Sequence, residues 1–351
     1  MRNRLITGVL ASALCSIVTL TACSAPAGTS TSAAGTTDSL NIACSQQEDF
    51  CQKITAAFQK ATGIKSTYVR LGSGEVLARL QTATGEFDVW SGGQAENHLI
   101  ANDKGFVTPY VSPNAAALTA EFKDDKGIWA GFYTDSIAFC SNSKELAKLG
   151  IAAPTSWQAL LDPKLKGHIA MPHPATAGVG YMAIFTVDAL NNGDKTKTID
   201  YFKSLNPSIV QYSKSAATGT EMAGRGEVAI AIALDSDCVK AKLSGFADLV
   251  NSYPAEGTGY EVGSVSILKG ARNEAAAKKY MDWILSTDAQ NQYADVPSYA
   301  APTLPKATVG KDVPPQTTLK KVPWDLRKAA DGRADFIKAF ESDVAASSTA
   351  K

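Results

Sequence analysis

Three short stretches of small and polar residues carry the most chemistry in this sequence, and each precedes a predicted helix. They are Leu71-Gly72-Ser73-Gly74-Glu75, Ser91-Gly92-Gly93-Gln94 and His173-Pro174-Ala175-Thr176-Ala177-Gly178. Small side chains let backbone N–H groups approach a ligand, and the N-terminus of a helix favours an anion. If the three stretches converge, they could together hold a phosphate, a phosphonate or a carboxylate without the need for a lysine. Each stretch taken alone is also typical of an ordinary turn or cap.

Two acidic features accompany these stretches. Asp235-Ser236-Asp237 follows the apolar run 228–234, and Glu256 opens the run Glu256-Gly257-Thr258-Gly259-Tyr260. Carboxylates at the end of a strand can accept hydrogen bonds from sugar hydroxyls or pair with an amine. A helix cap is the alternative for Asp235 or Asp237, and a solvated turn is the alternative for Glu256.

The elements that position these residues alternate along the chain. Apolar strands are predicted at 40–43, 66–70, 87–90, 137–140, 169–171, 228–234 and 265–268. Amphipathic helices are predicted at 50–62, from Thr155 to near Pro163, and at 274–286. This alternation predicts an α/β fold with mainly parallel sheets, in which ligands collect beyond the carboxyl ends of the strands.

The N-terminal segment indicates export. Arg2 and Arg4 precede an uncharged apolar run over 6–20, which is typical of a secretory signal peptide. The run ends at Leu20-Thr21-Ala22-Cys23, which resembles the bacterial lipobox and implies that Cys23 is lipidated after cleavage. An ordinary export signal cut elsewhere is the alternative. We predict a signal peptide over 1–22 and, over 23–39, a lipidated flexible tether rich in Ser, Ala, Thr and Gly. The protein is therefore expected at the cell membrane, anchored by lipid on its extracytoplasmic face.

The cysteines fit an exported protein. Apart from Cys15 and Cys23, four remain, and an even number in an exported chain favours disulfides. Cys44 ends a predicted strand and Cys51 opens the next helix, so the two can close a small loop, which leaves Cys140 to pair with Cys238. A zinc site is the alternative, but the close Cys and His spacings of such sites are missing.

Charge and motifs exclude several classes of protein. The chain has 34 basic and 34 acidic residues, and loss of residues 1–22 removes Arg2 and Arg4 and leaves a net charge of −2. This balance gives no support for nucleic-acid binding. The sequence has no Gly-x-Ser-x-Gly, His-Glu-x-x-His, Walker or Cys-x-x-Cys motif, so we predict neither an enzyme nor a cofactor or metal site. A structural or adhesive lipoprotein, the third class, would not need small-residue loops after successive strands.

An ordered series of motifs over about 40–305 resembles the type 2 periplasmic binding proteins. The branch it resembles contains ferric-iron, hexose-phosphate and aminoethylphosphonate binders. The motifs are Cys44-Ser45, Glu48-Asp49-Phe50-Cys51, Ala61-Thr62-Gly63-Ile64, Ser73-Gly74-Glu75, Asp88-Val89-Trp90-Ser91-Gly92-Gly93, Ser156-Trp157, Leu161-Asp162-Pro163-Lys164, Glu256-Gly257-Thr258-Gly259-Tyr260-Glu261-Val262-Gly263 and Lys269-Gly270-Ala271.

The resemblance implies a two-lobed clamp that closes on its ligand by a hinge between the lobes. The first lobe would hold 40–137 plus 262–345, and the second 138–261. The closed protein, which we expect to be a monomer, would deliver a small anionic ligand to a membrane permease driven by an ATPase, as the binding protein of an ABC transporter.

The resemblance also implies a set of ligand-binding residues. The set is Ser45, Ser73, Gly74, Gly93, Gln94, Thr176, Ala177, Gly178, Asp237 and Glu256. The chain reads Ala177-Gly178-Val179 where relatives often read Ser-Gly-Thr, and it has Ser236 where some carry His. Ferric binders present an adjacent Tyr pair, which this chain lacks. A sugar phosphate or a phosphonate is therefore the predicted ligand, and ferric iron is the alternative.

Overall fold

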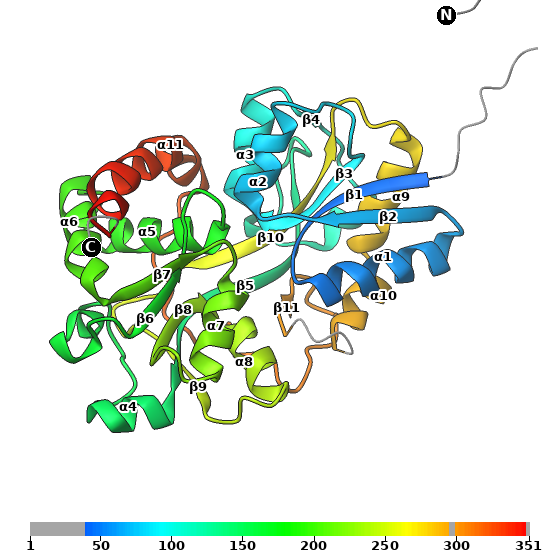
Figure 1. The fold of residues 1–351 in the computed structure, drawn as a ribbon. Helices are drawn as coiled ribbons and strands as arrows, with labels where there is room; N and C mark the ends of the chain where they lie inside the picture. The colour runs from blue at the N-terminus through cyan, green and yellow to red at the C-terminus, as the bar shows by residue number, and fades with distance from the viewer. Residues whose placement is uncertain (1–38, 295–298, 349–351) are drawn as a thin grey trace, which may run out of the picture. The chain divides into compact units, whose positions relative to one another are not determined.

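The computed structural model describes residues 39–294 and 299–348 (Figure 1). The predicted signal peptide, Cys23 and the tether up to residue 38 lie outside these ranges. Within the described ranges, no helix is both long enough and apolar enough to cross a membrane.

Strands and helices alternate as the sequence predicts. The strands are β1 (Ser39–Ser45), β2 (Lys65–Arg70), β3 (Val89–Gln94), β4 (Val107–Thr108), β5 (Ala130–Asn142), β6 (Ile169–Pro172), β7 (Ile209–Ser213), β8 (Ile230–Leu234), β9 (Leu249–Ser252), β10 (Tyr260–Leu268) and β11 (Ala301–Pro302). The α-helices are α1 (Glu48–Thr62), α2 (Ser73–Leu80), α3 (Ala95–Asp103), α4 (Ser143–Leu149), α5 (Gly178–Leu190), α6 (Lys195–Leu205), α7 (Ala216–Gly224), α8 (Asp235–Leu243), α9 (Glu274–Ile284), α10 (Thr287–Asn291) and α11 (Leu326–Asp343).

Helix α1 illustrates how local sequence sets these bounds. Glu48 and Asp49 lie in its first turn and Lys60 in its last, which complements the helix dipole. Its buried face carries Phe50 and Phe58, and the helix ends at Gly63, whose φ of 73° is the left-handed conformation that glycine adopts without strain. The prediction of a helix over 50–62 is confirmed.

The strands pair in the order β2-β1-β3-β10-β5-β8-β6-β7. Pairing is parallel within β2-β1-β3 and within β8-β6-β7. It is antiparallel where β10 meets β3 and β5, and where β5 meets β8. The expectation of mainly parallel sheets is therefore wrong for the middle of the sheet. There β5 runs from one group of strands into the other, because residues 130–136 pair with β10 and residues 137–141 pair with β8.

Two main hydrophobic clusters lie on either side of this crossing. One contains Phe50, Phe58 and Phe132, and the other contains Phe139 and Phe202. Strand β5 thus contributes Phe132 to the first cluster and Phe139 to the second. The α/β fold with two lobes is what the sequence predicts.

Helix α11 packs differently from the expected lobe assignment. It falls in the stretch 262–345 that was expected in the first lobe, but Ala329, Phe336 and Phe340 lie in the second cluster with Phe202. The helix contacts α5 and α6, beside which Figure 1 draws it, and also α3.

Two further local features bear on the predictions. The segment from Thr155, predicted as a helix, contains instead a 3-10 helix over Gln158–Leu161, followed by a second over Pro163–Leu165.

The four cysteines of the described residues lie in two pairs. The sulfur atoms of Cys44 and Cys51 lie 2.02 Å apart and those of Cys140 and Cys238 lie 1.98 Å apart, which is the separation of bonded sulfurs.

Candidate functional site

A small cavity lies where the carboxyl ends of strands from both groups meet. Its volume is about 60 Å³, and its walls come from the ends of β1, β2 and β3 and from the segments after β6, β7 and β8. The lining residues are Ser45, Gln46, Gln47, Arg70, Gly72, Ser73, Gln94, Tyr133, Ala177, Gly178, Val179, Lys214, Ser215, Ala216, Leu234, Asp237 and Glu261. This is the place that the topology of an open α/β sheet provides for a ligand.

Three helix N-termini meet at the cavity. Helix α2 begins at Ser73, α5 at Gly178 and α7 at Ala216, and all three residues line it. The first turn of a helix presents unpaired N–H groups and the positive end of the helix dipole. The cavity therefore suits an anion.

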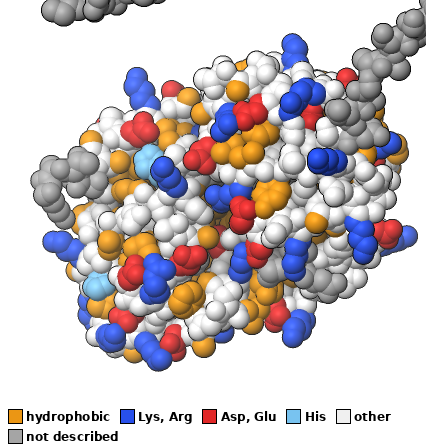
Figure 2. Space-filling view, turned by 45° about the vertical axis from the view of Figure 1, so that its right-hand side comes forward, with side chains coloured by type: hydrophobic (Ala, Val, Ile, Leu, Met, Phe, Trp, Pro, Cys, Tyr) orange, Lys and Arg blue, Asp and Glu red, His pale blue; other side chains and the backbone are white. Residues whose placement is uncertain are grey.

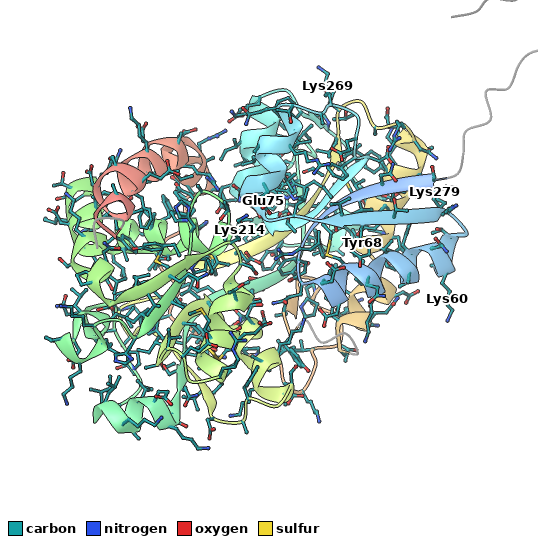
Figure 3. The ribbon with its side chains drawn as sticks, viewed as in Figure 1. Lys60, Tyr68, Glu75, Lys214, Lys269 and Lys279 are labelled. Carbon is teal, nitrogen blue, oxygen red and sulfur yellow. A yellow bond between two sulfur atoms is a disulfide. The ribbon has the colours of Figure 1, made fainter. Side chains whose placement is uncertain are left out.

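Two cationic side chains add to this field. Arg70 ends β2 and donates from Nε to the backbone oxygen of Gln46 at 3.1 Å. Lys214 follows β7, and Figure 3 places it near the middle of the molecule, far from peripheral lysines such as Lys60 and Lys279. Lys214 therefore adds to the wall a cationic side chain that the prediction of an anion site did not include.

Buried carboxyl groups line the same cavity. Burial raises the pKa of Asp237 to about 6, although the hydrogen bond from Gln47 lowers it. Burial raises the pKa of Glu261 to about 8, against hydrogen bonds from Tyr133 and Gln94. These groups can accept hydrogen bonds from ligand hydroxyls or an ammonium group, and partial protonation lets them donate as well.

The acidic group continues behind the wall. Asp135 and Asp235 are fully buried, and burial together with the neighbouring Asp235 raises the pKa of Asp135 well above its usual range. Tyr253 and Gln316 donate to Oδ2 of Asp235 at 3.1 and 2.8 Å. This network fixes the start of α8, which carries Asp237.

Close backbone approach explains two of the loop glycines. A Cβ atom on Gly72 would lie 2.5 Å from the backbone oxygen of Thr176, and one on Gly74 would lie 2.1 Å from that of Ala175. The 72–74 and 173–178 loops therefore touch main chain to main chain, which larger residues would prevent.

Six of the predicted ligand residues line the cavity. They are Ser45, Ser73, Gln94, Ala177, Gly178 and Asp237. Three others lie beside it: Gly93, whose added Cβ would meet Ser73 Oγ at 2.4 Å, Gly74 and Thr176. The structure does not bring Glu256 to the cavity, since its Oε1 accepts a hydrogen bond of 2.6 Å from the backbone N–H of Trp157.

Several lining residues were missed, with recognisable signals. Arg70 directly ends a predicted strand. Lys214 and Ser215 follow β7, whose Ile-Val-Gln-Tyr-Ser sequence is rich in residues that favour strands, although no strand was predicted there. Glu261 belongs to β10, which begins at Tyr260, earlier than the predicted Val265.

Charged side chains of both signs lie on the surface of the molecule. On the face that Figure 2 shows, basic and acidic side chains are interspersed, in agreement with the zero formal charge of the chain. Within residues 39–294 and 299–348, no group of three or more His, Cys, Asp or Glu residues could hold a metal ion.

Comparison with known proteins places the chain in a class that fits this site. Residues 95–329 match the family of bacterial extracellular solute-binding proteins. The chain belongs to this family, so it is a substrate-binding transport protein of the extracytoplasmic space and not an enzyme.

Particular relatives are similar over most of the chain. The periplasmic binding protein AfuA from Actinobacillus pleuropneumoniae, solved with fructose-6-phosphate bound, has a TM-score of 0.83 and 34% identity and covers 87% of this chain and 98% of its own. An uncharacterised Haemophilus influenzae protein is 36% identical over 72% of this chain and 74% of its own length. A putative 2-aminoethylphosphonate-binding periplasmic protein of Salmonella typhi is 27% identical over 68% of this chain and 70% of its own length.

Proposed function

We propose that the chain binds a phosphorylated sugar or a small phosphonate in the cavity and delivers it to an ABC permease with its ATPase. The observation that carries the proposal is the meeting of three helix N-termini, Arg70 and Lys214 at one cavity that also contains Asp237 and Glu261. The cations and N–H groups suit the phosphoryl or phosphonyl oxygens, and the carboxyl groups suit hydroxyl or ammonium donors. The fructose-6-phosphate bound to AfuA and the name of the phosphonate-binding relative agree with this ligand class.

The ligand would be held between two lobes. We propose that 40–137 with 262–325 form the first lobe and 138–261 the second, with α11 counted in the second because its apolar residues pack there. Closure would be favoured by a ligand that contacts both lobes. The chain would act as a monomer, with Cys44–Cys51 and Cys140–Cys238 disulfides.

Ferric iron has less support. Tyr133 is the single tyrosine among the described residues that line the cavity, and hard Fe(III) is best served by several phenolate oxygens. The phosphorylated or phosphonate ligand is therefore the one we put forward.

A thermal-unfolding panel tests the ligand class. The soluble chain from Ser24 would be heated with hexose phosphates, 2-aminoethylphosphonate, inorganic phosphate or ferric citrate. A ligand at one hundred times its dissociation constant adds about 2.7 kcal/mol of stability and raises the midpoint by a few degrees. A rise with a phosphorylated or phosphonate compound supports the proposal, and a rise with ferric citrate alone contradicts it.

The proposed lipid anchor at Cys23 has a separate test. Cys23→Ala should release the protein into the medium, because the remaining signal has no acceptor for the lipid. Fractionation of cells that express each form measures this, and continued membrane retention of the variant would remove the anchor from the account.

A further inference from the structure

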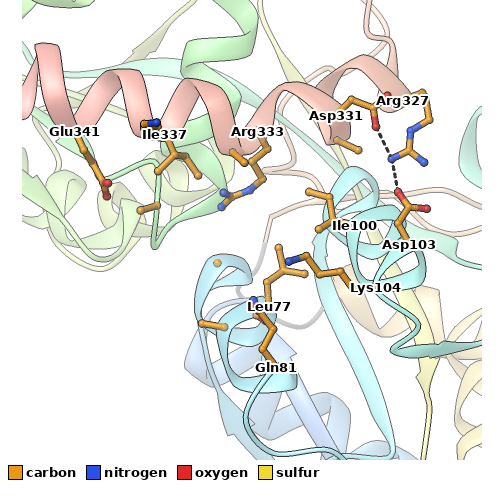
Figure 4. Close-up of a pocket in the computed structure, with 16 residues that line it drawn as sticks. Leu77, Gln81, Ile100, Asp103, Lys104, Arg327, Asp331, Arg333, Ile337 and Glu341 are labelled. Carbon is orange, nitrogen blue, oxygen red and sulfur yellow. Dashed lines mark hydrogen bonds and ion pairs between the residues drawn. The ribbon is translucent and has the colours of Figure 1, made fainter.

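Arg333 of α11 connects both walls of the cavity although it does not line it. Its side chain leaves α11 toward α2 and α3 (Figure 4), and the residue as a whole is 6% exposed. Nε donates to Oδ1 of Asn97 at 3.0 Å, and Nη2 donates to the backbone oxygen of Pro174 at 3.2 Å. One guanidinium thus bonds α3 of the first group of elements and the 173–178 loop of the second.

The contact to Asn97 continues into the cavity. Nδ2 of Asn97 donates to Oε1 of Gln94 at 2.9 Å, and Nε2 of Gln94 donates to Glu261. Because Arg333 can only donate, it requires the oxygen of Asn97 to face it, so that the amide nitrogen faces Gln94. Gln94 in turn must offer its nitrogen to Glu261 inside the cavity. The orientation of two amides therefore depends on Arg333.

The contact to Pro174 holds the other wall. Pro174 lies in the loop that leads to Ala177 and Gly178, both of which line the cavity. An added Cβ on Gly74 would lie 3.2 Å from Nη2 of Arg333, and an added Cβ on Gly178 would lie within 2 Å of Oε1 of Gln94. The guanidinium, the two loops and Gln94 thus form one packed unit.

The buried surroundings of Arg333 disfavour its positive charge. Its hydrogen bonds go to neutral oxygens, its guanidinium lies 5.2 Å above the ring of Tyr181, and burial lowers its pKa. Glu96, whose charge opposes that shift, is 1% exposed, and its Oε1 has no hydrogen-bond partner among the described residues. Apolar packing would join α11 to α3 at less cost than a buried cation.

We propose that Arg333 is a positioning residue for solute binding, which orients Gln94 of the first lobe through Asn97 and fixes the 173–178 loop of the second. The inference rests on the proposed function of the cavity. It assigns to helix α11 an influence, through Asn97 and the 173–178 loop, on a site built from the carboxyl ends of distant strands.

Arg327 provides a matched control on the same helix. It also joins α11 to α3, through an ion pair of 2.6 Å to Asp103, and it contacts Asp331 at 3.0 Å. Its side chain is 46% exposed, and it lines the same open groove of about 580 Å³ as Arg333 (Figure 4). Its contacts do not lead to the cavity.

Calorimetric titration tests the coupling. With fructose 6-phosphate or 2-aminoethylphosphonate, whichever the wild type binds, Arg333→Met should weaken affinity about tenfold or more, and Arg327→Met less than about twofold. In the double variant with Gln94→Ala, the loss should be smaller than the product of the two single losses, because both changes break the same chain of contacts. Unchanged affinity in Arg333→Met, or losses that multiply, would overturn the proposal.

Hydrogen exchange tests the same inference without a ligand. Amides in 93–98 and 173–178 should exchange faster in Arg333→Met than in the wild type, and at the wild-type rate in Arg327→Met. Arg333→Lys keeps the charge but has no planar fork, so its exchange rates should fall between those of the wild type and of Arg333→Met. If Arg333→Met does not fold, Arg333→Lys takes its place in the comparison. If the wild type binds neither compound, the proposed function fails, whereas equal exchange in all variants refutes the role of Arg333.

Discussion

Gln47 and Asp237 meet across the cavity, where Nε2 of Gln47 donates a hydrogen bond to Oδ1 of Asp237. Gln47 caps the start of α1, and Asp237 lies in the first turn of α8, so the bond joins the two groups of elements. Both residues line the cavity. A ligand with a hydroxyl or ammonium donor can replace the Gln47 amide on this carboxyl group.

Removal of this carboxyl group should weaken binding. Asp237→Ala is expected to reduce affinity for the phosphorylated or phosphonate ligand about tenfold or more, because hydrogen bonds to charged groups contribute about 1.5–3 kcal/mol. Titration calorimetry measures the effect, with far-UV circular dichroism to check the fold. Asp248→Ala is the control, since Asp248 pairs with Lys144 at the surface. Equal affinity in Asp237→Ala and the wild type would take Asp237 out of the site.

A neighbouring ion pair should help to hold the cleft closed. Nζ of Lys240 lies 2.6 Å from Oδ1 of Asp49, with side chains 23% and 33% exposed. Such a pair contributes less than about 1 kcal/mol, so Lys240→Met should weaken affinity less than about fivefold, and only at low salt. Lys203→Met, which removes the exposed pair with Asp200, should leave affinity unchanged. A loss of affinity in Lys240→Met that persists at high salt would contradict an electrostatic role for the Lys240–Asp49 pair.

Stability should fall as the pH rises from about 6.5 to about 8. Burial raises the pKa of Glu96 to about 7 and that of Glu261 to about 8, so the native state holds these protons more tightly than the unfolded chain. The contribution of these two groups to the free energy of unfolding is complete at acidic pH and is lost as the pH rises through their native pKa values. Burial of His98 has the opposite effect, because it lowers that pKa to about 3, but this contribution is constant above the unfolded pKa of about 6.5.

Thermal unfolding of the ligand-free protein measures this change. The loss over that interval should be about 2 kcal/mol, equivalent to a few degrees in the midpoint. Glu261→Gln should flatten the profile, and Glu86→Gln, at an exposed pair with Arg79, should not. A midpoint that rises toward pH 8 in the wild type would show that these carboxyl groups are ionised in the native state.

The two cysteine pairs should contribute unequally to stability. Cys140 and Cys238 are separated by 98 residues, whereas Cys44 and Cys51 are separated by 7. The chain-entropy model gives about 5 kcal/mol for the longer loop and about 2 kcal/mol for the shorter one. Replacement of both cysteines of the longer loop by serine should therefore lower the unfolding midpoint more than the same change in the shorter loop. Equal midpoints in the two double variants would mean that loop closure does not set the difference.

Local patterns predicted the elements whose signals are local. The apolar run at 40–43, the amphipathic face of 50–62 and the helix from Glu274 appear as β1, α1 and α9. The segment from Thr155 forms 3-10 turns instead of an α-helix, and Pro163 starts the second of them. Strand direction was not predictable, because the antiparallel strands β5 and β10 are buried over almost their whole length and lack the solvated face that marks many antiparallel strands.

The site was predictable where small residues lie at or after the end of a strand, as at Ser73, Gly93 and Gly178. Lys214 was not found because no strand was predicted at β7, and its loop carries no glycine. Glu256 was expected in the site from a resemblance, but its carboxylate reaches Trp157 instead. The contribution of Arg333 depends on tertiary contacts with α3 and the 173–178 loop, which no local pattern encodes.

The most direct measurement is a calorimetric titration of the soluble protein with fructose 6-phosphate and 2-aminoethylphosphonate, each beside its analogue without phosphorus, fructose or ethylamine. The account predicts saturable binding of at least one phosphorus compound, no binding of its analogue, and a loss of about tenfold or more in Lys214→Met. Binding of fructose or ethylamine with the same affinity as the phosphorus compound, or full affinity in Lys214→Met, would contradict an anion site at this cavity.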